Sequence, residues 1–364
     1  MKILHVEGGA HLYGGAQQVL YLLQGLGGHG VESHLACRPG CDLARRAAPF
    51  ARVHELPMGG DLDLGMIGRL RRLIETLRPD LVHLHSRIGA DVMGGIAARL
   101  AGVPVVHTRR VDNPEPRWLV ASKYRLHDRV IAISEGIARV LLAEGLPPDK
   151  LRVVRSAVVA RDFQQPCERR RVLEALGLGH GGEGGELLLV GVIAQLIERK
   201  GHGVLLDAMP ALIERFPRLR LVLFGKGPLA GRLQQRIDAE GLAEHVRLAG
   251  FRADLGQILP CLDLLVHPAL MEGLGVSLLQ ASAAAVPIVA SRVGGIPEAV
   301  RDGINGLLVP PGDVDALGRA VAALLADPAL RRRLGAAGRA LIEEEFSPGV
   351  MVEGNLAVYR ELLS

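Results

Sequence analysis

The chain has 364 residues, of which 49% are hydrophobic and 3% aromatic, and its formal net charge is +4 at pH 7. This length is enough for two domains of ordinary size, each with its own hydrophobic core. The charge is modest and no nucleic-acid-binding motif occurs, which excludes a nucleic-acid partner, and no apolar run approaches the ~20 residues of a membrane span.

The charge is distributed unevenly. Residues 1–160 hold 21 basic and 15 acidic side chains, whereas the rest of the chain holds 22 basic and 24 acidic ones. A basic first half could contact an anionic membrane or an acidic acceptor, although a solvated Arg-rich surface gives the same count. The cysteines, Cys37, Cys41, Cys167 and Cys261, match no zinc-binding or CxxC spacing. No signal peptide precedes the first predicted strand, so we expect reduced thiols in a cytosolic protein.

Short apolar strands alternate with helix-length segments along the whole chain. This alternation predicts parallel sheets with crossover helices, the α/β class. In the first half, the predicted strands are residues 3–6, 32–37, 52–56, 81–85, 103–107, 130–134 and 152–154. In the second half, they are residues 187–193, 220–224, 246–249, 262–267, 288–290 and 307–309. Two such series predict two Rossmann-like domains.

A glycine-rich loop follows the first predicted strand and precedes an apolar helix expected over residues 19–26. The loop contains Gly14 and Gly15, but the GxGxxG spacing of a dinucleotide-binding fold is absent. Successive backbone N–H groups in such a loop can bind a phosphate. The alternative is a flexible surface loop.

Histidines and arginines gather near the ends of first-half strands. His83 and His85 alternate along one strand and therefore lie on the same face of the sheet. They could form a metal pair, but no third ligand is evident, so we expect core or cleft histidines and no bound metal. His107, Arg109 and Arg110 mark the end of the next strand. An arginine there could bind an anionic acceptor or a sugar.

The segment between residues 159 and 186 is polar, charged and rich in glycine, which is typical of a linker. We therefore predict an N-terminal domain over 1–165, a linker over 166–186 and a C-terminal domain over 187–340. The last segment, 341–364, is helical in pattern with a break at Ser347-Pro348-Gly349.

Two loops near the start of the second strand series carry polar side chains. The first contains Gln195 and Lys200, and lysine is scarce in this chain. An ammonium in such a turn can neutralise a leaving phosphate, although a surface lysine is the alternative. The second contains Gly225 and Gly227, whose flexibility permits a tight turn around Lys226. We expect Lys226 to face solvent.

The segment Glu272-Gly-Leu-Gly-Val-Ser-Leu-Leu-Gln280 links an apolar strand to an apolar helix expected over residues 276–285. It places backbone N–H groups and a helix N-terminus at the carboxyl end of a parallel strand, where an anion binds well. Glu272 and Gln280 can accept hydrogen bonds from hydroxyl groups beside that anion. The pattern predicts a nucleotide-sugar site; an ordinary strand-to-helix turn with a chance glutamate is the alternative.

Three further blocks follow this segment: Pro287-Ile-Val-Ala-Ser, Gly294-Gly295-Ile-Pro-Glu298 and Asn305-Gly306-Leu-Leu-Val. In this order they resemble the donor-binding signature of the retaining family 4 glycosyltransferases, which have the GT-B fold. The resemblance covers nearly the whole chain and is strongest over residues 187–312. It implies two doubly wound, Rossmann-like domains that face a central cleft, with the helix over 341–364 crossing back onto the first domain.

The resemblance also implies roles for individual residues. The donor-binding residues would be Gly14, Gly15, Gln195, Lys200, Gly225, Gly227, Glu272, Gly273, Leu274, Gly275 and Gln280. The catalytic ones would be Glu272, Lys200 and Arg110. The acceptor side would hold His85, His107, Arg109 and Ser134, although Ser134 could simply cap a helix. The family needs no bound metal or other cofactor.

Several positions depart from the family pattern. The family has an arginine where this chain has Gln195, and a second glutamate where it has Gln280. It often has a histidine near the position of Arg110, and many members have Pro-Asn-Gly where this chain has Arg155-Ser156-Ala157. The two glutamines bring no charge to the donor site.

The function implied is a glycosyltransferase that moves a sugar from a nucleoside diphosphate sugar, based on UDP or GDP, to an acceptor hydroxyl with retention. The acceptor would be a glycan, a glycolipid or a small molecule, for example in lipopolysaccharide or other envelope glycan synthesis. We expect a cytoplasmic protein, peripheral to the inner membrane face if the basic half binds lipid. The alternatives are a nucleotide-sugar epimerase and a catalytically silent sugar-nucleotide-binding protein.

Overall fold

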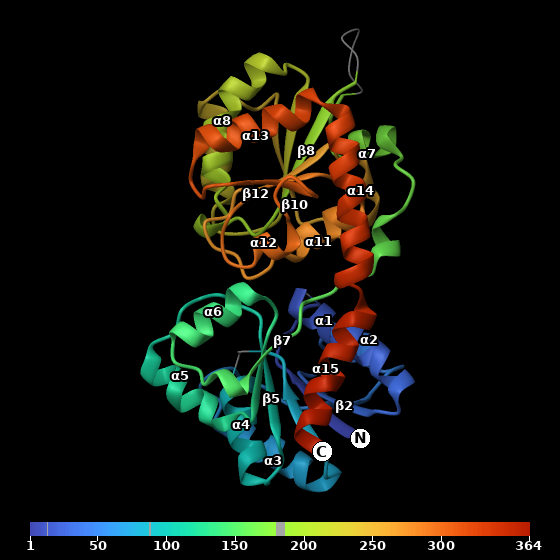
Figure 1. The fold of residues 1–364 in the computed structure, drawn as a ribbon, viewed down its shortest axis with the longest axis vertical. Helices are drawn as coiled ribbons and strands as arrows, with labels where there is room; N and C mark the ends of the chain where they lie inside the picture. Colours follow the sequence, from blue (N-terminus) through green and yellow to red (C-terminus); the bar gives the residue numbers. More distant parts are fainter. Residues whose placement is uncertain (13, 87–88, 180–185) are drawn as a thin grey trace. The chain divides into compact units, whose positions relative to one another are not determined.

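The computed structural model describes residues 1–12, 14–86, 89–179 and 186–364 (Figure 1). The chain divides into two compact units, one of Met1–Ala157 with Pro348–Ser364 and one of Val158–Ser347. Each unit is a parallel sheet with helices on both faces. The last helix thus returns to the first unit, and the preceding helix ends just before the break predicted at Ser347.

The first unit holds a parallel sheet in the order β3-β2-β1-β4-β5-β6-β7. Its strands are β1 Lys2–Glu7, β2 Glu32–Cys37, β3 Arg52–Glu55, β4 Leu81–Leu84, β5 Val105–Arg109, β6 Arg129–Ala132 and β7 Leu151–Val153. Its helices are α1 Gly14–Leu26, α2 Asp42–Ala47, α3 Gly65–Leu77, α4 Ala90–Leu100, α5 Arg117–Lys123, α6 Glu135–Ala143 and α15 Pro348–Leu363. The order reverses between β1 and β4, the position where ligands bind in doubly wound sheets.

Apolar side chains dock α15 onto the first unit. Leu356 and Tyr359 of α15 are fully buried and share one hydrophobic cluster with Leu22 and Leu26 of α1. Burial of such side chains contributes roughly 1.5–3 kcal/mol each. This apolar face explains why the chain end belongs to the first unit.

The second unit holds a parallel sheet in the order β10-β9-β8-β11-β12-β13. Its strands are β8 Leu188–Ile193, β9 Leu219–Phe224, β10 Val246–Gly250, β11 Leu264–His267, β12 Ile288–Ser291 and β13 Gly306–Val309. Its helices are α7 Arg169–Ala175, α8 His202–Arg215, α9 Ala230–Ala239, α10 Leu255–Ile258, α11 Val276–Ala283, α12 Ile296–Ala299, α13 Val314–Ala326 and α14 Pro328–Glu345. Here the order reverses between β8 and β11.

All the predicted strands are present, with ends that differ by at most two residues, and the two parallel Rossmann-like sheets confirm the predicted fold class. Among the described residues, no helix combines the length and apolar character needed to cross a membrane.

The structure corrects the domain boundaries that the sequence predicted. The chain passes from the first unit to the second at Ala157, so the predicted linker over 166–186 belongs to the second unit. Part of this segment forms helix α7, whose Val172 and Leu173 are buried. Residues 180–185 of the predicted linker lie outside the described residues. The segment was predicted as a linker because α7 is mostly polar and buries only one apolar side.

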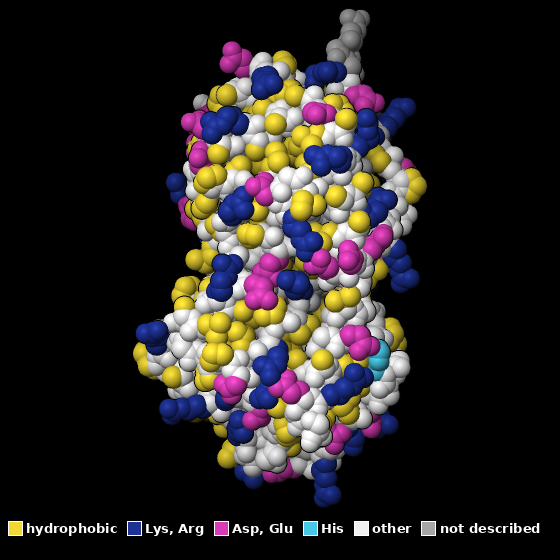
Figure 2. Space-filling view, in the orientation of Figure 1, with side chains coloured by type: hydrophobic (Ala, Val, Ile, Leu, Met, Phe, Trp, Pro, Cys, Tyr) yellow, Lys and Arg dark blue, Asp and Glu magenta, His cyan; other side chains and the backbone are white. Residues whose placement is uncertain are grey.

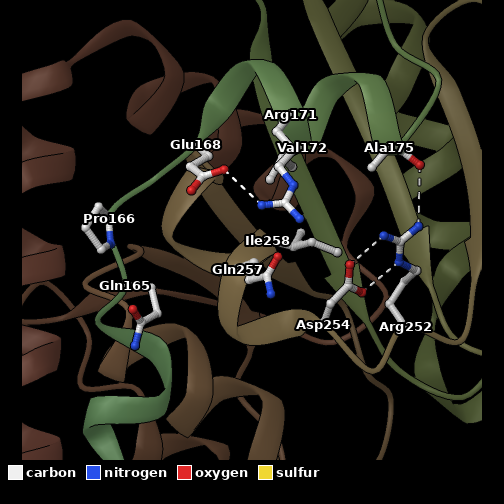
Figure 3. A pocket seen from close by; sticks show the side chains of 10 residues that line it. All are labelled: Gln165, Pro166, Glu168, Arg171, Val172, Ala175, Arg252, Asp254, Gln257 and Ile258. Carbon is white, nitrogen blue, oxygen red and sulfur yellow. Dashed lines mark hydrogen bonds and ion pairs between the residues drawn. The ribbon is translucent and has the colours of Figure 1, made fainter.

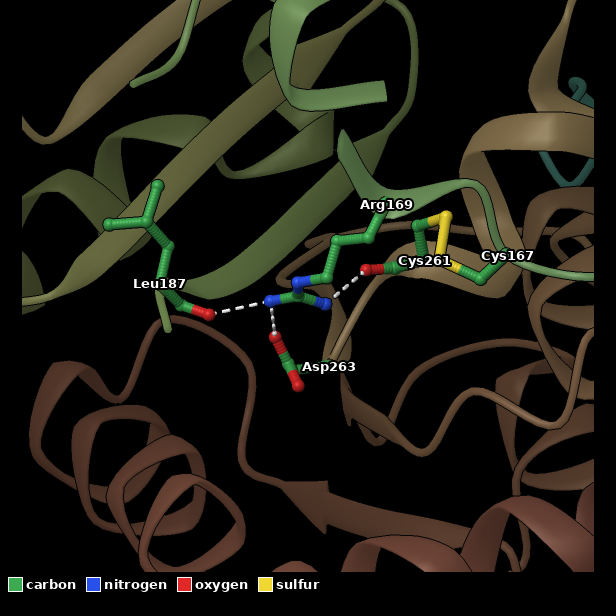
Figure 4. The surroundings of a disulfide bond; sticks show 5 residues. All are labelled: Cys167, Arg169, Leu187, Cys261 and Asp263. Atoms are coloured by element: carbon green, nitrogen blue, oxygen red, sulfur yellow. Dashed lines mark hydrogen bonds and ion pairs between the residues drawn. A yellow bond between two sulfur atoms is a disulfide. The ribbon is translucent and has the colours of Figure 1, made fainter. Parts of the chain in front are cut away.

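A disulfide between Cys167 and Cys261 fastens this segment to the second unit, with Cα atoms 5.1 Å apart (Figure 4). Beside it, the Arg169 guanidinium donates to the carbonyl oxygens of Cys261 and Leu187 and to the Asp263 carboxylate. The expectation of reduced thiols is therefore wrong for this pair. The two cysteines are 94 residues apart in sequence, so only the fold reveals their proximity. Cys37 and Cys41 are free and buried.

We expect the Cys167→Ser variant to unfold at lower urea concentration than the wild type. A cross-link that closes a long loop typically contributes about 2–5 kcal/mol to the free energy of unfolding. Urea titrations without reductant measure the loss, and Cys37→Ser is the control that leaves the cross-link intact. Dithiothreitol should destabilise the wild type but not Cys167→Ser. A wild type that is indifferent to dithiothreitol would contradict a stabilising disulfide.

Candidate functional site

The order reversal of the second sheet brings together two loops that carry charged side chains. Strands β8 and β11 are paired in parallel, with Leu265 opposite Gly191. Parallel neighbours end at the same sheet edge, so the loops that follow them are adjacent. Lys200 lies in the loop after β8, and Glu272 lies in the loop after β11.

Lys200 and Glu272 form an ion pair at this edge. The Lys200 ammonium donates to Glu272 Oε2, and His267 Nε2 lies 2.9 Å from the same oxygen. The backbone N–H of Gly273 donates to Oε1 at 3.1 Å. The side chains of Lys200 and Glu272 are only 10% and 13% exposed, and His267 is 2% exposed. The structure thus joins two predicted site residues through one carboxylate.

The environment of Glu272 sets its charge. Burial alone would raise the pKa of this carboxyl, but the hydrogen bond and charge of His267 and the Lys200 ammonium outweigh burial and lower the pKa to about 2. Glu272 is therefore ionised at neutral pH. An ionised carboxylate is the stronger acceptor for a substrate hydroxyl.

The backbone of Glu272 is held by a close approach of the loop after β12. Gly295 N donates to Glu272 O at 3.2 Å. Gly294 has φ +52°, and a Cβ there would lie 1.9 Å from the same carbonyl oxygen. Only glycine fits, because this contact excludes any side chain. The predicted Gly-Gly block therefore supports the backbone of the loop that carries Glu272.

Gly225, which the sequence analysis placed among the donor-binding residues, has a similar structural role. A Cβ on Gly225 would lie 1.9 Å from Ala194 O, and Leu196 N donates to Lys226 O at 3.0 Å. Gly227 likewise packs against Leu196 O. These glycines fit the loop after β9 against the loop that leads to Lys200. Lys226 is exposed, as predicted.

The remaining predicted donor residues differ in accessibility. Gln195 is exposed and Gln280 is half-buried on α11, and neither side chain bonds to any residue that the structure describes. Gly273 and Gly275 are buried in the turn that starts α11. Leu274 is 1% exposed and packs in the core, so only its backbone can face a ligand.

Two buried histidines beside the ion pair were missed by the sequence reasoning. His267 ends β11 and contacts Glu272, and His202 begins α8. Burial, with the nearby charges of His267 and Lys200, lowers the pKa of His202 to about 4. His267 could have been identified from the sequence, because it directly precedes Pro268, the first residue of the loop that contains Glu272.

In the first unit, Arg109 is a structural residue rather than an acceptor-side one. Its side chain is 1% exposed and donates to the Glu115 carboxylate at 2.8 Å. It also donates to the carbonyl oxygens of Val111 and Asn113. Lys123 binds the other Glu115 oxygen at 2.6 Å. The network shapes the loop after β5, and each of the three guanidinium nitrogens of Arg109 donates to a residue of that loop.

Two other predicted acceptor-side residues are also interior. His107 is fully buried on β5, and burial lowers its pKa well below the usual value. Ser134 is fully buried and its hydroxyl accepts from Ile137 N at 3.1 Å, which caps α6. The helix-cap alternative therefore describes Ser134.

His5 supplies the third histidine that the sequence could not provide, because strand pairing sets it opposite His83. His5, His83 and His85 have ligand atoms within 4.8 Å of one another. However, His83 bonds Tyr359 Oη at 2.6 Å and Thr108 Oγ1 at 2.7 Å, and its ring centroid lies 3.8 Å from that of His85. The His83 and His85 rings are tilted by 39°, and His5 Nδ1 lies 3.0 Å from His85 Nε2, so hydrogen bonds hold the three rings together.

Arg110 lies near the start of α1, where Gly14 and Gly15 were predicted to bind phosphate. Its Cδ is 3.4 Å from the position that a Cβ on Gly15 would take. Burial lowers the pKa of Arg110 to about 10, against the opposing charge of Glu7. Its Nε is buried with no hydrogen-bond partner among the described residues. The structure therefore brings Arg110 and Gly15 together within the first unit.

A separate cavity of about 410 Å³ lies in the second unit between α7 and the segment around α10 (Figure 3). Its charged side chains bond one another: Arg252 binds Asp254 through two hydrogen bonds, and Arg171 binds Glu168. It shares no residue with the predicted donor set.

Comparisons with known proteins agree with this geometry. A family model described as glycosyl transferases group 1 matches residues 181–341, and one described as glycosyltransferase family 4 matches residues 13–160. The putative glycosyltransferase EpsD of Bacillus subtilis is 31% identical over 297 residues, 76% of this chain and 75% of that protein. A D-inositol 3-phosphate glycosyltransferase of Thermobifida fusca is 32% identical over 355 residues, 89% of this chain and 80% of that protein.

Two solved structures share the fold along the whole chain. Anabaena Alr3699/HepE in complex with UDP has a TM-score of 0.85 at 19% identity, covering 99% of this chain and 100% of that one. A glycosyltransferase from Rickettsia africae has a TM-score of 0.87 at 19% identity, covering 100% of this chain and 98% of that one.

Proposed function

The chain belongs to the family 4, group 1 glycosyltransferases of the GT-B fold, and on that premise we propose that it transfers a sugar from a nucleoside diphosphate sugar to an acceptor hydroxyl with retention. The observation that carries the proposal is the buried Lys200–Glu272 pair at the order reversal of the second sheet. It offers a cation for a diphosphate and a carboxylate for sugar hydroxyls.

The proposed chemistry uses these two groups. The acceptor oxygen bonds to the anomeric carbon on the face from which the diphosphate departs, and the acceptor proton passes to the departing phosphate oxygen. Lys200 stabilises the charge that grows on the diphosphate, and Glu272 orients the sugar. Gln280 would bind the ribose. In the first unit, Gly14, Gly15 and Arg110 would offer N–H donors to a phosphate. We propose that no metal is needed, which an assay in EDTA tests.

A donor panel tests the proposal directly. UDP-, GDP- and ADP-sugars are compared by thermal shift, because a bound ligand raises the melting temperature. HepE has been solved with UDP and with UDP-glucose, which makes UDP-glucose the first donor to try. Release of free nucleoside diphosphate only when an acceptor is present identifies a transferase. Release without acceptor would favour another chemistry, and binding without turnover across an acceptor panel would point to a silent binding protein. The family match does not favour the epimerase alternative.

We also propose that the acceptor belongs to an envelope glycan or glycolipid such as lipopolysaccharide, and that the protein works in the cytoplasm against the inner membrane face. The support lies on α5, where Trp118 is 73% exposed next to the exposed Arg117. The basic helix α3 is weaker support, because Arg69 pairs with Asp63 and Arg71 with Glu75. On the face shown in Figure 2, basic and acidic side chains are mixed.

We expect salt-sensitive binding to vesicles that contain anionic lipid, and weaker binding by Trp118→Ala. An exposed aromatic ring inserts at the lipid interface, and the adjacent Arg117 is attracted to anionic headgroups. Vesicle flotation at low and high salt measures both effects. Equal binding to neutral and anionic vesicles, or no binding at all, would contradict the membrane proposal.

A further inference from the structure

The two charged side chains of the proposed donor site, Lys200 and Glu272, bind each other. The Lys200 ammonium binds Glu272 Oε2, and both side chains are largely buried. A diphosphate that takes the ammonium must therefore draw it away from the carboxylate. This step rests on the proposed function, because it assumes that Lys200 receives the donor diphosphate.

Separation of the pair would leave the Glu272 carboxylate without its cation. A mostly buried carboxylate that loses its partner is strongly destabilised unless other donors remain on it. Among the described residues, two such donors remain: Gly273 N on Oε1 at 3.1 Å and His267 Nε2 on Oε2 at 2.9 Å. His267 is thus the side chain left on the oxygen that Lys200 vacates.

His267 is well placed to hold that oxygen. It is the last residue of β11, is paired with Ala290 of β12, and is 2% exposed. Its Nδ1 is buried without a hydrogen-bond partner among the described residues. Nε2 carries a proton in both the Nε2–H tautomer and the protonated ring, so either form can donate to Glu272.

From this geometry we infer that His267 is a positioning residue that holds the Glu272 carboxylate in place while the donor diphosphate occupies Lys200. In the free protein Lys200 and His267 share Glu272 Oε2, so the ion pair still holds the carboxylate when His267 is lost. In the donor complex His267 becomes the anchor that aims Glu272 at a sugar hydroxyl. The expected signature is therefore a defect that is larger in the donor complex than in the free protein.

Three variants separate these states. His267→Phe keeps the ring volume but removes the donor, and His267→Gln returns an N–H donor near the place of Nε2. His202→Phe is the matched control, because His202 is 2% exposed, lies beside the same cluster and makes no hydrogen bond to a described residue. Replacing an unbonded buried ring by an apolar one of similar shape is nearly neutral.

The measurements are the melting temperature of the free protein and the dissociation constant for UDP-glucose by calorimetry. We expect His267→Phe to lower the melting temperature of the free protein only slightly, because Lys200 and Gly273 stay on the carboxylate, but to bind UDP-glucose about tenfold to a hundredfold more weakly, the loss for one hydrogen bond to a charged group. His267→Gln should recover to within a few-fold, and His202→Phe should bind as the wild type does. In the Glu272→Gln background, His267→Phe should add little, because it acts through that carboxylate.

Other outcomes overturn the inference. An equal loss of binding in His202→Phe, or a full additive loss in the Glu272→Gln background, would each assign His267 to the general fold. If the wild type binds neither UDP-glucose nor GDP- or ADP-glucose, the proposed function fails and the role of His267 fails with it. If the wild type binds and His267→Phe binds equally well, the proposed function stands and the positioning role is wrong.

Discussion

The Lys200→Ala variant is expected to turn over at least roughly a hundredfold more slowly than the wild type. The ammonium lies at the carboxyl edge of the second sheet and would neutralise the charge that develops on the leaving diphosphate. Loss of one such electrostatic partner in a pre-organised site typically costs about a hundredfold to a thousandfold in rate. Steady-state kinetics with the donor that the panel identifies measure the effect.

The structure adds a stability cost to this variant. Lys200 is buried and neutralises Glu272, so its removal leaves a buried carboxylate on which, within the described part of the chain, only His267 and Gly273 still form hydrogen bonds. Breaking one side of a buried pair typically costs about 3–5 kcal/mol. Kinetics must therefore be read at a temperature where circular dichroism shows the variant to be folded.

Lys226→Ala is the matched control for this prediction. Lys226 follows the neighbouring strand, is exposed and forms no ion pair with a described residue. It should keep wild-type turnover and stability. Unchanged kinetics in a folded Lys200→Ala would remove Lys200 from the site, and an equal loss in Lys226→Ala would show that the assay reports a general charge effect.

The Glu272→Gln variant should lose most of its transfer activity. The carboxylate is ionised, and it would accept sugar hydroxyls through charge-assisted hydrogen bonds that contribute about 1.5–3 kcal/mol. A neutral amide of the same shape forms weaker bonds and leaves Lys200 without its counter-charge. We expect kcat/KM to fall roughly tenfold to a hundredfold, measured with the same donor.

Gln280 provides the comparison for Glu272. It lies one turn into α11 and would bind the ribose in the ground and transition states alike, so Gln280→Ala should mainly raise the donor KM. Gln280→Glu, which restores the residue of the family, should be tolerated. Full activity in Glu272→Gln together with loss of kcat in Gln280→Ala would reverse the roles proposed for the two residues.

The low pKa of Glu272 also predicts how stability depends on pH. The folded-state pKa of about 2 lies below the ordinary value of 4.5, so ionisation of Glu272 favours the folded state at neutral pH. The contribution is present above about pH 4.5, amounts to about 3 kcal/mol, and is lost as the pH falls through the folded pKa. Urea unfolding at pH 6 and pH 3 should show a larger decrease for the wild type than for Glu272→Gln. Equal decreases would contradict an ionised, paired Glu272.

The sequence by itself determined the alternation of strands and helices. Apolar runs such as residues 264–267 can only be buried strands in this setting, because the glycine-rich turns that follow them end each run. The order of the sequence blocks that follow Glu272 also indicated the family. Their spacing is set locally, by the turn that starts a helix after a strand and by the glycines of the next loop. These features depend on neighbours in the chain, and the structure confirms the strands and the parallel sheets.

Only the tertiary structure decided which polar side chains meet. Lys200 and Glu272 are 72 residues apart, and their ion pair exists because β8 and β11 are neighbours in the sheet. Cys167 and Cys261, 94 residues apart, also meet only in the folded second unit, and no spacing rule could show it. Arg109 shows the opposite error: its position after a strand suggested a ligand contact, whereas burial turns its donors toward Glu115 and the loop carbonyls. Local propensity depends on adjacent residues, but contacts between charged groups depend on strand order and burial, which arise only when the whole sheet forms.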